Sequence, residues 1–482
     1  DVRGQLFGEE YVVVTGRTVL PDGTPVGGNE ARVSVHISAA GEDETPLSQV
    51  VPASDGKFSA RVPAGHEYVV DAWAFGRVVA SRHLAAGESQ TGEIEIPHAA
   101  RVDLSVTVDG LPGEAMIFFH PADDETREAV RGKLNGRFAE CAPLLGAPYG
   151  SSPACNALLI FRGGPVQVDV PAGNYHVYAT AGPFSTIARE TVRLAGQAEE
   201  NLLFSLTRLP IQPQGTLSAD LHVHSGRSFD SVFPEHDRVL SVLAASLDVF
   251  VATEHDLTHD YRDAIAELGA GSRFVVIPGT ESTGFILFLK VPGSSIPKVI
   301  GHWNFWPLLY EPLEPRGGVP WTQVAEPGEL FERMQPAFSG YPVIQLNHPW
   351  EDDFAGRDQG WPRALGMNLK KPLPREDDGT AAGLFVRIPE CTSEPCREIR
   401  TRNDAYHVQE VINGTRNDEF LPDRAFWFYL LDQGIVHAGT ANSDSHFIGE
   451  DFIGSPRNIV YTGSTVADFD VTEFNTAVRQ GR

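Results

Sequence analysis

The sequence predicts a multidomain protein, with two N-terminal β-sandwich modules followed by an α/β domain whose parallel strands form a barrel-like sheet. A chain of 482 residues is too long for one ordinary core. Residues 9–209 read as short β-branched runs separated by turn sequences, and after residue 216 apolar runs alternate with helix-length segments. We therefore expect a first module over residues 1–97, a second over 98–210 and the α/β domain over 216–482.

A weak internal repeat supports two sandwich modules rather than one. Val62-Pro-Ala-Gly and Val170-Pro-Ala-Gly each precede a strand with a tyrosine, Tyr68 or Tyr175, and the copies start 108 residues apart (170 minus 62). That offset is the length of one β-sandwich domain. The turn followed by Tyr-x-Val resembles carboxypeptidase-regulatory-like and related Ig-like sandwich modules. The second module carries a long inserted loop over residues 121–157.

The α/β domain is predicted from seven short apolar runs with helical patterns between them. Residues 234–247 and 418–433 place apolar side chains on one side of a helix. Seven strands with intervening helices favour a barrel-like parallel sheet. The predicted strands cover residues 217–222, 249–253, 274–279, 298–302, 343–348, 408–413 and 435–440.

The composition is that of a globular protein with an acidic surface. Lys plus Arg number 38 against 64 Asp plus Glu, which gives a formal net charge of -26. Such a surface repels phosphate backbones and anionic lipid, so we expect no nucleic-acid partner. No apolar run reaches the roughly 18 residues that a membrane-spanning helix needs, so we expect no integral membrane segment. The oligomeric state stays open.

Four cysteines and the start of the chain indicate export. Cys141 with Cys155, and Cys391 with Cys396, form two local pairs in loop-like sequence. Disulfides across such loops suit an oxidising compartment, although four thiols allow three pairings and four unpaired thiols would fit a cytosolic enzyme. The chain starts at Asp1 without a basic and apolar leader, as a mature form does after its signal peptide is removed. We expect a periplasmic or secreted protein.

Metal-competent side chains follow almost every predicted strand of the α/β domain. In a parallel α/β barrel the carboxyl ends of all strands meet on one face, so these side chains would converge. His222 and His224 are two apart on a strand and therefore point to the same face. Imidazole nitrogen together with carboxylate oxygen suits zinc, iron or manganese. The candidate metal ligands are His222, His224, Asp230, His255, Glu281, His302, His348, Asp444 and His446.

The order of these motifs resembles the PHP superfamily (polymerase and histidinol phosphatase domain), and within it the CehA/McbA-like metallohydrolases. The resemblance covers about residues 216–482 and implies a distorted (β/α)7 barrel that binds two or three divalent transition-metal ions. The motifs that carry it are Asp220-Leu-His-Val-His-Ser, Thr253-Glu-His-Asp, Gly301-His-Trp-Asn-Phe, Asn413-Gly and Ser443-Asp-Ser-His.

The resemblance also implies how the ligands divide. A first ion would be held by His222, His224, Glu281 and Asp444. Glu281 would bridge to a second ion held by His302 and His348. A third would be held by Asp230, His255 and His446. Many relatives have histidine at the position of Asp230, so this residue would either bind its metal weakly or transfer protons, and two versus three ions stays open.

These residues predict a metal-dependent hydrolase that acts on a small-molecule ester. Two cations that share a carboxylate lower the pKa of a bridging water and supply hydroxide at neutral pH. A neighbouring group must protonate the leaving oxygen, and Asp230, His255 and His446 are the candidates. Arg227 either pairs with a substrate phosphate or forms a salt bridge with a nearby carboxylate.

Three functions are compatible with this sequence. Phosphomonoesters or phosphodiesters are the favoured substrates, because the PHP fold is used mostly for them. Carbamates or aryl carboxylic esters are the alternative, because the CehA/McbA-like subgroup includes carbamate hydrolases, and Trp303, Phe305 and Trp306 either line a leaving-group pocket or belong to the core. The third function is binding of a surface glycan or protein through residues 9–209 with an inactive barrel, against which the full ligand set argues.

Overall fold

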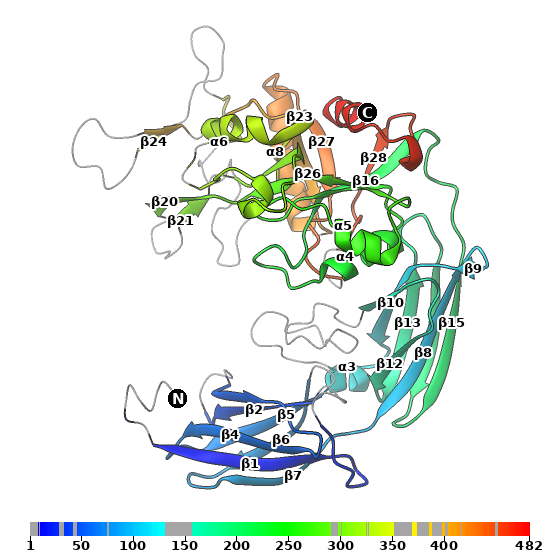
Figure 1. Ribbon diagram of the computed structural model, residues 1–482, viewed down its shortest axis with the longest axis vertical. Helices are drawn as coiled ribbons and strands as arrows, with labels where there is room; N and C mark the ends of the chain where they lie inside the picture. Colours follow the sequence, from blue (N-terminus) through cyan, green and yellow to red (C-terminus); the bar gives the residue numbers. More distant parts are fainter. Residues whose placement is uncertain are drawn as a thin grey trace. The chain divides into compact units, whose positions relative to one another are not determined.

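The computed structural model divides into two compact units, Asp1–Ala181 with Ser185–Arg208, and Gly182–Phe184 with Leu209–Arg482 (Figure 1). All four cysteines, and with them the predicted disulfides, lie outside the described residues. The structure describes residues 8, 10–27, 33–41, 46–74, 77–130, 157–290, 297–299, 301–323, 325, 327–350, 369–373, 385–387, 398–400, 403–415, 417–448 and 452–482.

The first unit begins with a β-sandwich whose strands alternate inward apolar and outward polar side chains. In β4 (Lys57–Pro63), for example, Phe58, Ala60 and Val62 are buried while the residues between them are exposed. One sheet has the order β4-β1-β7 and the other β3-β2-β5-β6. The remaining strands are β1 (Tyr11–Val19), β2 (Ser34–Ala39), β3 (Ser48–Val50), β5 (Tyr68–Ala74), β6 (Arg77–Leu84) and β7 (Gln90–Glu95).

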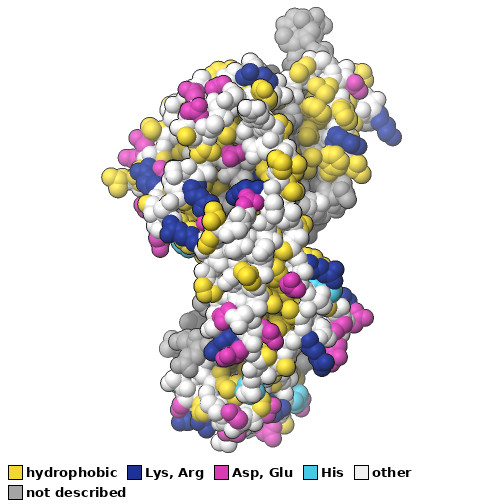
Figure 2. All heavy atoms as spheres, turned by 90° about the vertical axis from the view of Figure 1, so that its right-hand side faces the viewer, with side chains coloured by type: hydrophobic (Ala, Val, Ile, Leu, Met, Phe, Trp, Pro, Cys, Tyr) yellow, Lys and Arg dark blue, Asp and Glu magenta, His cyan; other side chains and the backbone are white. Residues whose placement is uncertain are grey.

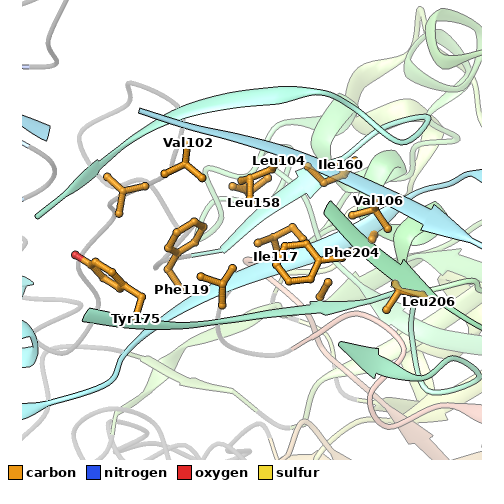
Figure 3. Close-up of a cluster of buried hydrophobic side chains, with 14 of the residues drawn as sticks. Val102, Leu104, Val106, Ile117, Phe119, Leu158, Ile160, Tyr175, Phe204 and Leu206 are labelled. Carbon is orange, nitrogen blue, oxygen red and sulfur yellow. The ribbon is translucent and has the colours of Figure 1, made fainter. Parts of the chain in front are cut away.

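A second sandwich completes this unit. Its sheets have the orders β11-β10-β13-β14 and β12-β8-β15, with β9 paired to β8. Buried side chains from both sheets, among them Leu104, Phe119 and Phe204, fill the space between them (Figure 3). The elements are β8 (Ala99–Val108), β9 (Leu111–Pro112), β10 (Ala115–Pro121), α3 (Asp124–Val130), β11 (Ala157–Ile160), β12 (Val166–Pro171), β13 (Gly173–Thr180), β14 (Ile187–Leu194) and β15 (Glu199–Leu206).

The two sandwiches repeat one strand plan, which explains the repeated sequence. In each, a central strand pairs antiparallel on one side and parallel on the other, as β1 does with β4 and β7 and β8 does with β12 and β15. The repeated tyrosines are both fully buried, and each donates its hydroxyl hydrogen bond to the proline carbonyl of the Val-Pro-Ala-Gly turn, Tyr68 to Pro63 and Tyr175 to Pro171. The turn and the tyrosine therefore form one structural unit in both copies.

The second unit contains the α/β part of the chain. The predicted helices at 234–247 and 418–433 are present as α4 and α8. The elements of the unit are β16 (Thr216–Val223), α4 (Glu235–Ala244), β17 (Val249–Ala252), α5 (Arg262–Leu268), β18 (Val275–Pro278), β19 (Thr280–Ser282), β20 (Phe285–Lys290), β21 (Pro297–Val299), β22 (Trp303–Leu308), η1 (Pro315–Gly318), α6 (Pro327–Met334), η2 (Gln335–Ala337), β23 (Phe338–Leu346), β24 (Phe385–Arg387), β25 (Glu398–Arg400), β26 (Val408–Asn413), α8 (Asn417–Asp432), β27 (Ala438–Asn442), β28 (Asn458–Tyr461), η3 (Val466–Asp468) and α9 (Val471–Arg479).

The main strands of this unit form two sheets, with the orders β18-β17-β16-β28 and β19-β22-β23-β26-β27. Two single parallel bridges connect the sheets. Val223, at the end of β16, pairs with Ser445, which follows β27, and His255, which follows β17, pairs with Glu281 in β19. The expectation of a wholly parallel sheet was wrong for β22, which is antiparallel to both β19 and β23. The described part of the link from β19 to β22 is the hairpin β20–β21, and antiparallel neighbours need no helical crossover. Closure into a (β/α)7 barrel stays a prediction.

The surface carries charges of both signs. Figure 2 shows acidic and basic side chains interspersed over the face that it draws. Among the described residues, none of the helices combines the length and the apolar character that crossing a membrane requires.

Candidate metal centre

Eight of the nine predicted ligands lie in a strand of the second unit or within four residues of one. His222 is the second-last residue of β16 and His224 directly follows that strand, while His255 lies three residues after β17. Glu281 lies within the short strand β19. His348 comes after β23, and Asp444 and His446 come after β27. Asp230 is the exception, because it lies in the loop between β16 and α4.

His302 also lies among these ligands, but at the start of a strand and not at the end of one as the sequence predicted. We expected it at the end of a strand over 298–302, but it directly precedes β22 (Trp303–Leu308). Because β22 is antiparallel to its neighbours, its first residue lies at the edge where the parallel strands end. The reversed strand therefore brings His302 to the ligands that follow the parallel strands.

The structure brings eight of the nine residues into three groups that could hold metal ions, with the candidate ligand atoms of each group within 4.8 Å of one another. Glu281 belongs to the first and second groups, and His224 belongs to the first and third. The first group is His222, His224, Glu281 and Asp444, the second is Glu281, His302 and His348, and the third is His224, His255 and His446.

The carboxylate of Glu281 lies between the first two groups. Its Oε2 is 3.2 Å from Nε2 of both His222 and His224, and Oδ1 of Asp444 is 3.1 Å and 3.0 Å from the same two nitrogens. Its Oε1 is 3.2 Å from Nδ1 of His302 and 3.3 Å from Nε2 of His348. Ligand atoms about 2.0–2.2 Å from one shared cation lie about 3.0–3.5 Å from each other. The spacing around each oxygen is therefore the spacing of a coordination shell.

The atoms that face one another here are left without ordinary hydrogen bonds. Seven buried side-chain atoms of the predicted ligands have no hydrogen-bond partner within the described part of the chain, although several are within 3.3 Å of an oppositely charged group. Burying such an atom unpaired costs about 1–3 kcal/mol. A cation would supply the missing partner. The atoms are Nε2 of His222, His224 and His446, Nδ1 of His255, Oδ1 of Asp230 and Asp444, and Oε2 of Glu281.

Hydrogen bonds on the far side of the two strand histidines fix which nitrogen faces the centre. Nδ1 of His222 is 2.9 Å from Oε1 of Glu410, so Nδ1 carries a proton and Nε2 is the nitrogen that faces the centre. Nδ1 of His224 is 2.9 Å from Oγ of Ser228, which itself donates to Oε2 of Glu254. Nε2 of both histidines consequently faces Glu281 and Asp444. Carboxylates that orient metal-binding histidines in this way are common behind metal sites.

Glu410 was not predicted from the sequence. It lies on β26 in an apolar stretch and is fully buried. Its two oxygens accept hydrogen bonds from Nδ1 of His222, the backbone N–H of His348 and the amides of Asn442 and Asn413, at 2.7–3.0 Å. An acidic residue next to Val411 and Ile412 on a predicted buried strand was the signal that could have found it.

Electrostatics couple the imidazoles and carboxylates of the first group. Burial opposes the charged form of His224, but Asp444 and Glu281 overcome this and raise its pKa to about 9. The pKa of Glu281 is lowered well below its ordinary value because His222, His255 and His302 outweigh burial, which acts in the opposite direction. The carboxylates are therefore ionised at neutral pH. Their negative charges are the ones a divalent cation would neutralise.

Asp230 contacts the third group without being a member of it. Its Oδ2 is 3.0 Å from Nε2 of His255 and 3.4 Å from Nε2 of His446. Burial would raise the pKa of Asp230, but these two imidazoles lower it. Asp230 is therefore ionised at neutral pH and has no proton of its own to donate. The geometry favours a role for Asp230 in orienting the imidazoles of His255 and His446.

Arg227 pairs with Glu235, the salt-bridge alternative considered above, and its side chain is half exposed. A role for Arg227 in binding a substrate phosphate stays a prediction. Trp303, Phe305 and Trp306 are fully buried and belong to apolar clusters, so the structure places them in the core and not in a leaving-group pocket.

A second arginine holds two ligand-bearing segments together. Arg238 on α4 is fully buried and donates to the carbonyl oxygen of His224 at 2.6 Å. The same guanidinium donates to both Oγ and the carbonyl oxygen of Ser445 at 2.9 Å. It thereby fixes the end of β16 against the loop after β27.

Two ligand candidates also have an unusual backbone conformation. His348 and Asp444 have φ angles of +21° and +51°, in or near the left-handed region that side chains with a Cβ rarely adopt. Such conformations persist where the surrounding structure enforces them, and they concentrate at functional sites.

Comparison with known proteins gives weak likenesses only. No family model and no curated protein matches the chain. Among solved structures, it is similar to a two-domain protein of Bacteroides vulgatus described as containing a predicted PHP-like metal-dependent phosphoesterase, at 19% identity and a TM-score of 0.32, over 56% of this chain and 65% of that one. The chain thus spans less than two thirds of that protein. Membership of the PHP superfamily and of its CehA/McbA-like subgroup stays a prediction.

Pilins make up several of the other likenesses. A minor pilin of Streptococcus agalactiae matches at 13% identity and a TM-score of 0.25, over 42% of this chain and 98% of that chain. The shaft pilin SpaA of Lactobacillus rhamnosus matches at 11% identity and a TM-score of 0.20, over 42% and 100% of the two chains. These scores are below the level at which two chains share one fold.

Proposed function

We propose that this protein is a metal-dependent hydrolase of ester bonds and that phosphoesters are its favoured substrates. The observation that carries the proposal is the set of seven buried ligand atoms that have no hydrogen-bond partner among the described residues, three of which lie 3.1–3.2 Å from Oε2 of Glu281. Imidazole and carboxylate donors in this ratio suit zinc, manganese or iron. When bound, two or three such ions would polarise the substrate oxygen and lower the pKa of a water that they share.

The residues of the chain have distinct parts in this proposal. His222, His224, Glu281 and Asp444 would hold the first ion, and Glu281 with His302 and His348 the second. His255 and His446 would hold the third together with His224 or Asp230. Glu281 keeps the first two sites close because one oxygen of its carboxylate faces each of them.

Proton transfer at the leaving oxygen is assigned to Asp230 and His446. Among the nine predicted ligands their side chains are the most exposed, at 24% and 18%, which leaves them open to substrate. If only the first two sites hold ions and His446 is free of metal, Asp230 would orient the imidazole of His446, and His446 would deliver the proton. We further propose that the protein is exported and works in the periplasm or outside the cell.

The test is metal analysis combined with hydrolysis of p-nitrophenyl substrates. We expect two or three equivalents of transition metal per chain, and release of p-nitrophenol from phosphate mono- or diesters that stops with chelator and returns with metal. Glu281→Gln should lower the rate at least about a thousandfold, because it removes the shared charge. Glu267→Gln, on the exposed side of α5, is the matched control and should leave the rate unchanged.

Two results would count against this function. Fewer than two equivalents of metal after reconstitution would contradict the metal sites. Faster release from carbamate or acetate esters than from phosphate esters would favour the alternative substrates on the same ions.

A further inference from the structure

We propose that Phe229 is the platform on which an aryl substituent of the substrate packs, so that the metal site selects aromatic esters. This inference rests on the proposed function, and it names the class of group that the site recognises beside the bond to be cleaved. Phe229 immediately precedes Asp230, so it lies next to the residues assigned to proton transfer.

Phe229 is an exposed aromatic ring directly beside the metal groups. It is 75% exposed, and its ring centre is 4.7 Å from that of His255 at an interplanar angle of 32°. An exposed phenyl ring beside buried polar residues gains nothing for folding, whereas covering it with an apolar group is favourable. The ring contacts His255 on one side, and its remaining exposed surface is available to a substituent of a ligand bound at the adjoining metal groups.

The loop that carries Phe229 is held in place by the site itself. Oγ of Ser231 donates to the carbonyl oxygen of His446 at 2.7 Å. Ser228 bonds to both Glu254 and His224 through its hydroxyl, and the N–H of Gly226 donates to the carbonyl of Phe233 at 2.6 Å. A platform fixed in this way can select a substituent by position as well as by polarity.

The surroundings of Phe229 favour an apolar substituent over an anionic one. Val232, on the same loop, is 45% exposed, and the ring centre of Phe447 is 6.2 Å from that of His446. The arginines of this segment are engaged elsewhere, Arg227 by Glu235 and Arg238 by backbone carbonyls. Stacking on the ring of Phe229 is thus the strongest interaction that the described residues of this loop offer to a substituent.

The test compares two ligands that differ only in the substituent. Binding of phenylphosphonate and methylphosphonate to the metal-loaded full-length chain is measured by calorimetry, which needs no turnover. The wild-type protein should prefer phenylphosphonate, and Phe229→Ala should reduce that preference about threefold to tenfold without changing methylphosphonate affinity. Phe229→Leu, which keeps apolar surface but no ring, should lie in between.

The control is Phe428→Ala, which removes a phenyl ring that is 49% exposed on α8. It should leave the preference unchanged, and thermal unfolding of each variant shows that the fold is intact. An unchanged preference in Phe229→Ala, with both phosphonates still bound, would overturn the role of Phe229 and leave the proposed function standing. Failure of the wild-type protein to bind either phosphonate would overturn both.

Discussion

The two units differ in what they bury besides an apolar core. The second sandwich is filled by residues such as Leu104, Phe119 and Phe204, packed between two sheets. The second unit has apolar clusters too, but at the edge where its strands end it also buries histidine and carboxylate atoms that have no hydrogen-bond partner among the described residues. The first interior stabilises its unit by itself. The second also contains buried polar atoms that a bound cation would stabilise, and this difference distinguishes scaffold from candidate site.

The largest effect of a single substitution is expected from a cavity in the sandwich. Phe119 is 1% exposed and packs edge-to-face on Tyr175 with ring centres 5.8 Å apart. Phe119→Ala should lower the free energy of unfolding of the first unit by about 3–5 kcal/mol, measured by urea denaturation. Metal content should not change. Leu203→Ala, 65% exposed on β15, is the control and should cost less than about 0.5 kcal/mol.

Metal should stabilise the second unit alone. At a free metal concentration about a hundredfold above Kd, each site adds about 2.7 kcal/mol to the free energy of unfolding of the folded form that binds it. In scanning calorimetry we expect the midpoint temperature of one unfolding transition to rise with metal and to fall with chelator, while the midpoint of the other transition stays constant. The same shift should appear in Phe119→Ala. Equal shifts in both transitions would show that the two interiors are not independent.

Glu410→Gln tests whether the buried polar interior is organised around the ligands. All the groups around the Glu410 carboxylate that hydrogen-bond to it are donors, so the amide of glutamine would oppose one of them. The imidazole of His222 would lose its orientation, and we expect metal affinity to fall about tenfold to a hundredfold. Competition with a chelating dye measures this. Glu235→Gln, which removes a carboxylate that pairs with Arg227, should leave the affinity unchanged.

The smallest effect is expected on the pH dependence of stability, from His407 of the second unit, which is neither in an apolar cluster nor among the candidate metal ligands. Nδ1 of His407 accepts a hydrogen bond from the backbone N–H of Ile344 at 2.9 Å, and burial lowers its pKa to about 4. Between its unfolded pKa of about 6.5 and this value, the unfolded state binds a proton that the folded state does not. Stability should therefore fall as pH decreases through that window and change no further below it.

His407→Asn removes the titrating group and can keep the acceptor. Its urea midpoint should decrease less than that of the wild-type protein between pH 7 and pH 5, and the two should differ little in slope above pH 7. Parallel pH profiles would show that His407 does not contribute.

The sequence predicted the sandwiches and most of the site because both leave local patterns. Alternation in β4 and the Val-Pro-Ala-Gly turns reveal strands, and histidines that follow apolar runs reveal an edge where strands end. Whether a residue lies at the start or at the end of a strand at this edge is not determined by the local sequence, however. His302 was expected at the end of a strand and lies at the start of a reversed one, because strand direction depends on pairing partners far away in the chain.

Residues that act through others were harder to find than ligands. Glu410 and Arg238 look like ordinary members of a strand and a helix, and only the fold shows that one orients His222 and the other joins His224 to Ser445. The aromatic run at Trp303 was ambiguous for the opposite reason, since an aromatic residue fits a pocket and a core equally well. The structure places its side chain in the core at 1% exposure.

The reversed strand has a consequence for how this site can vary. The link from β19 to β22 leaves from the ligand edge at Glu281 and returns to the same edge at His302, because β19 and β22 are antiparallel neighbours. A longer, shorter or different link between β19 and β22 would change the surroundings of the ligands, while the strand order and the ligands themselves stay in place. Homologous chains with different substrates are thus expected to differ most between residues 283 and 300.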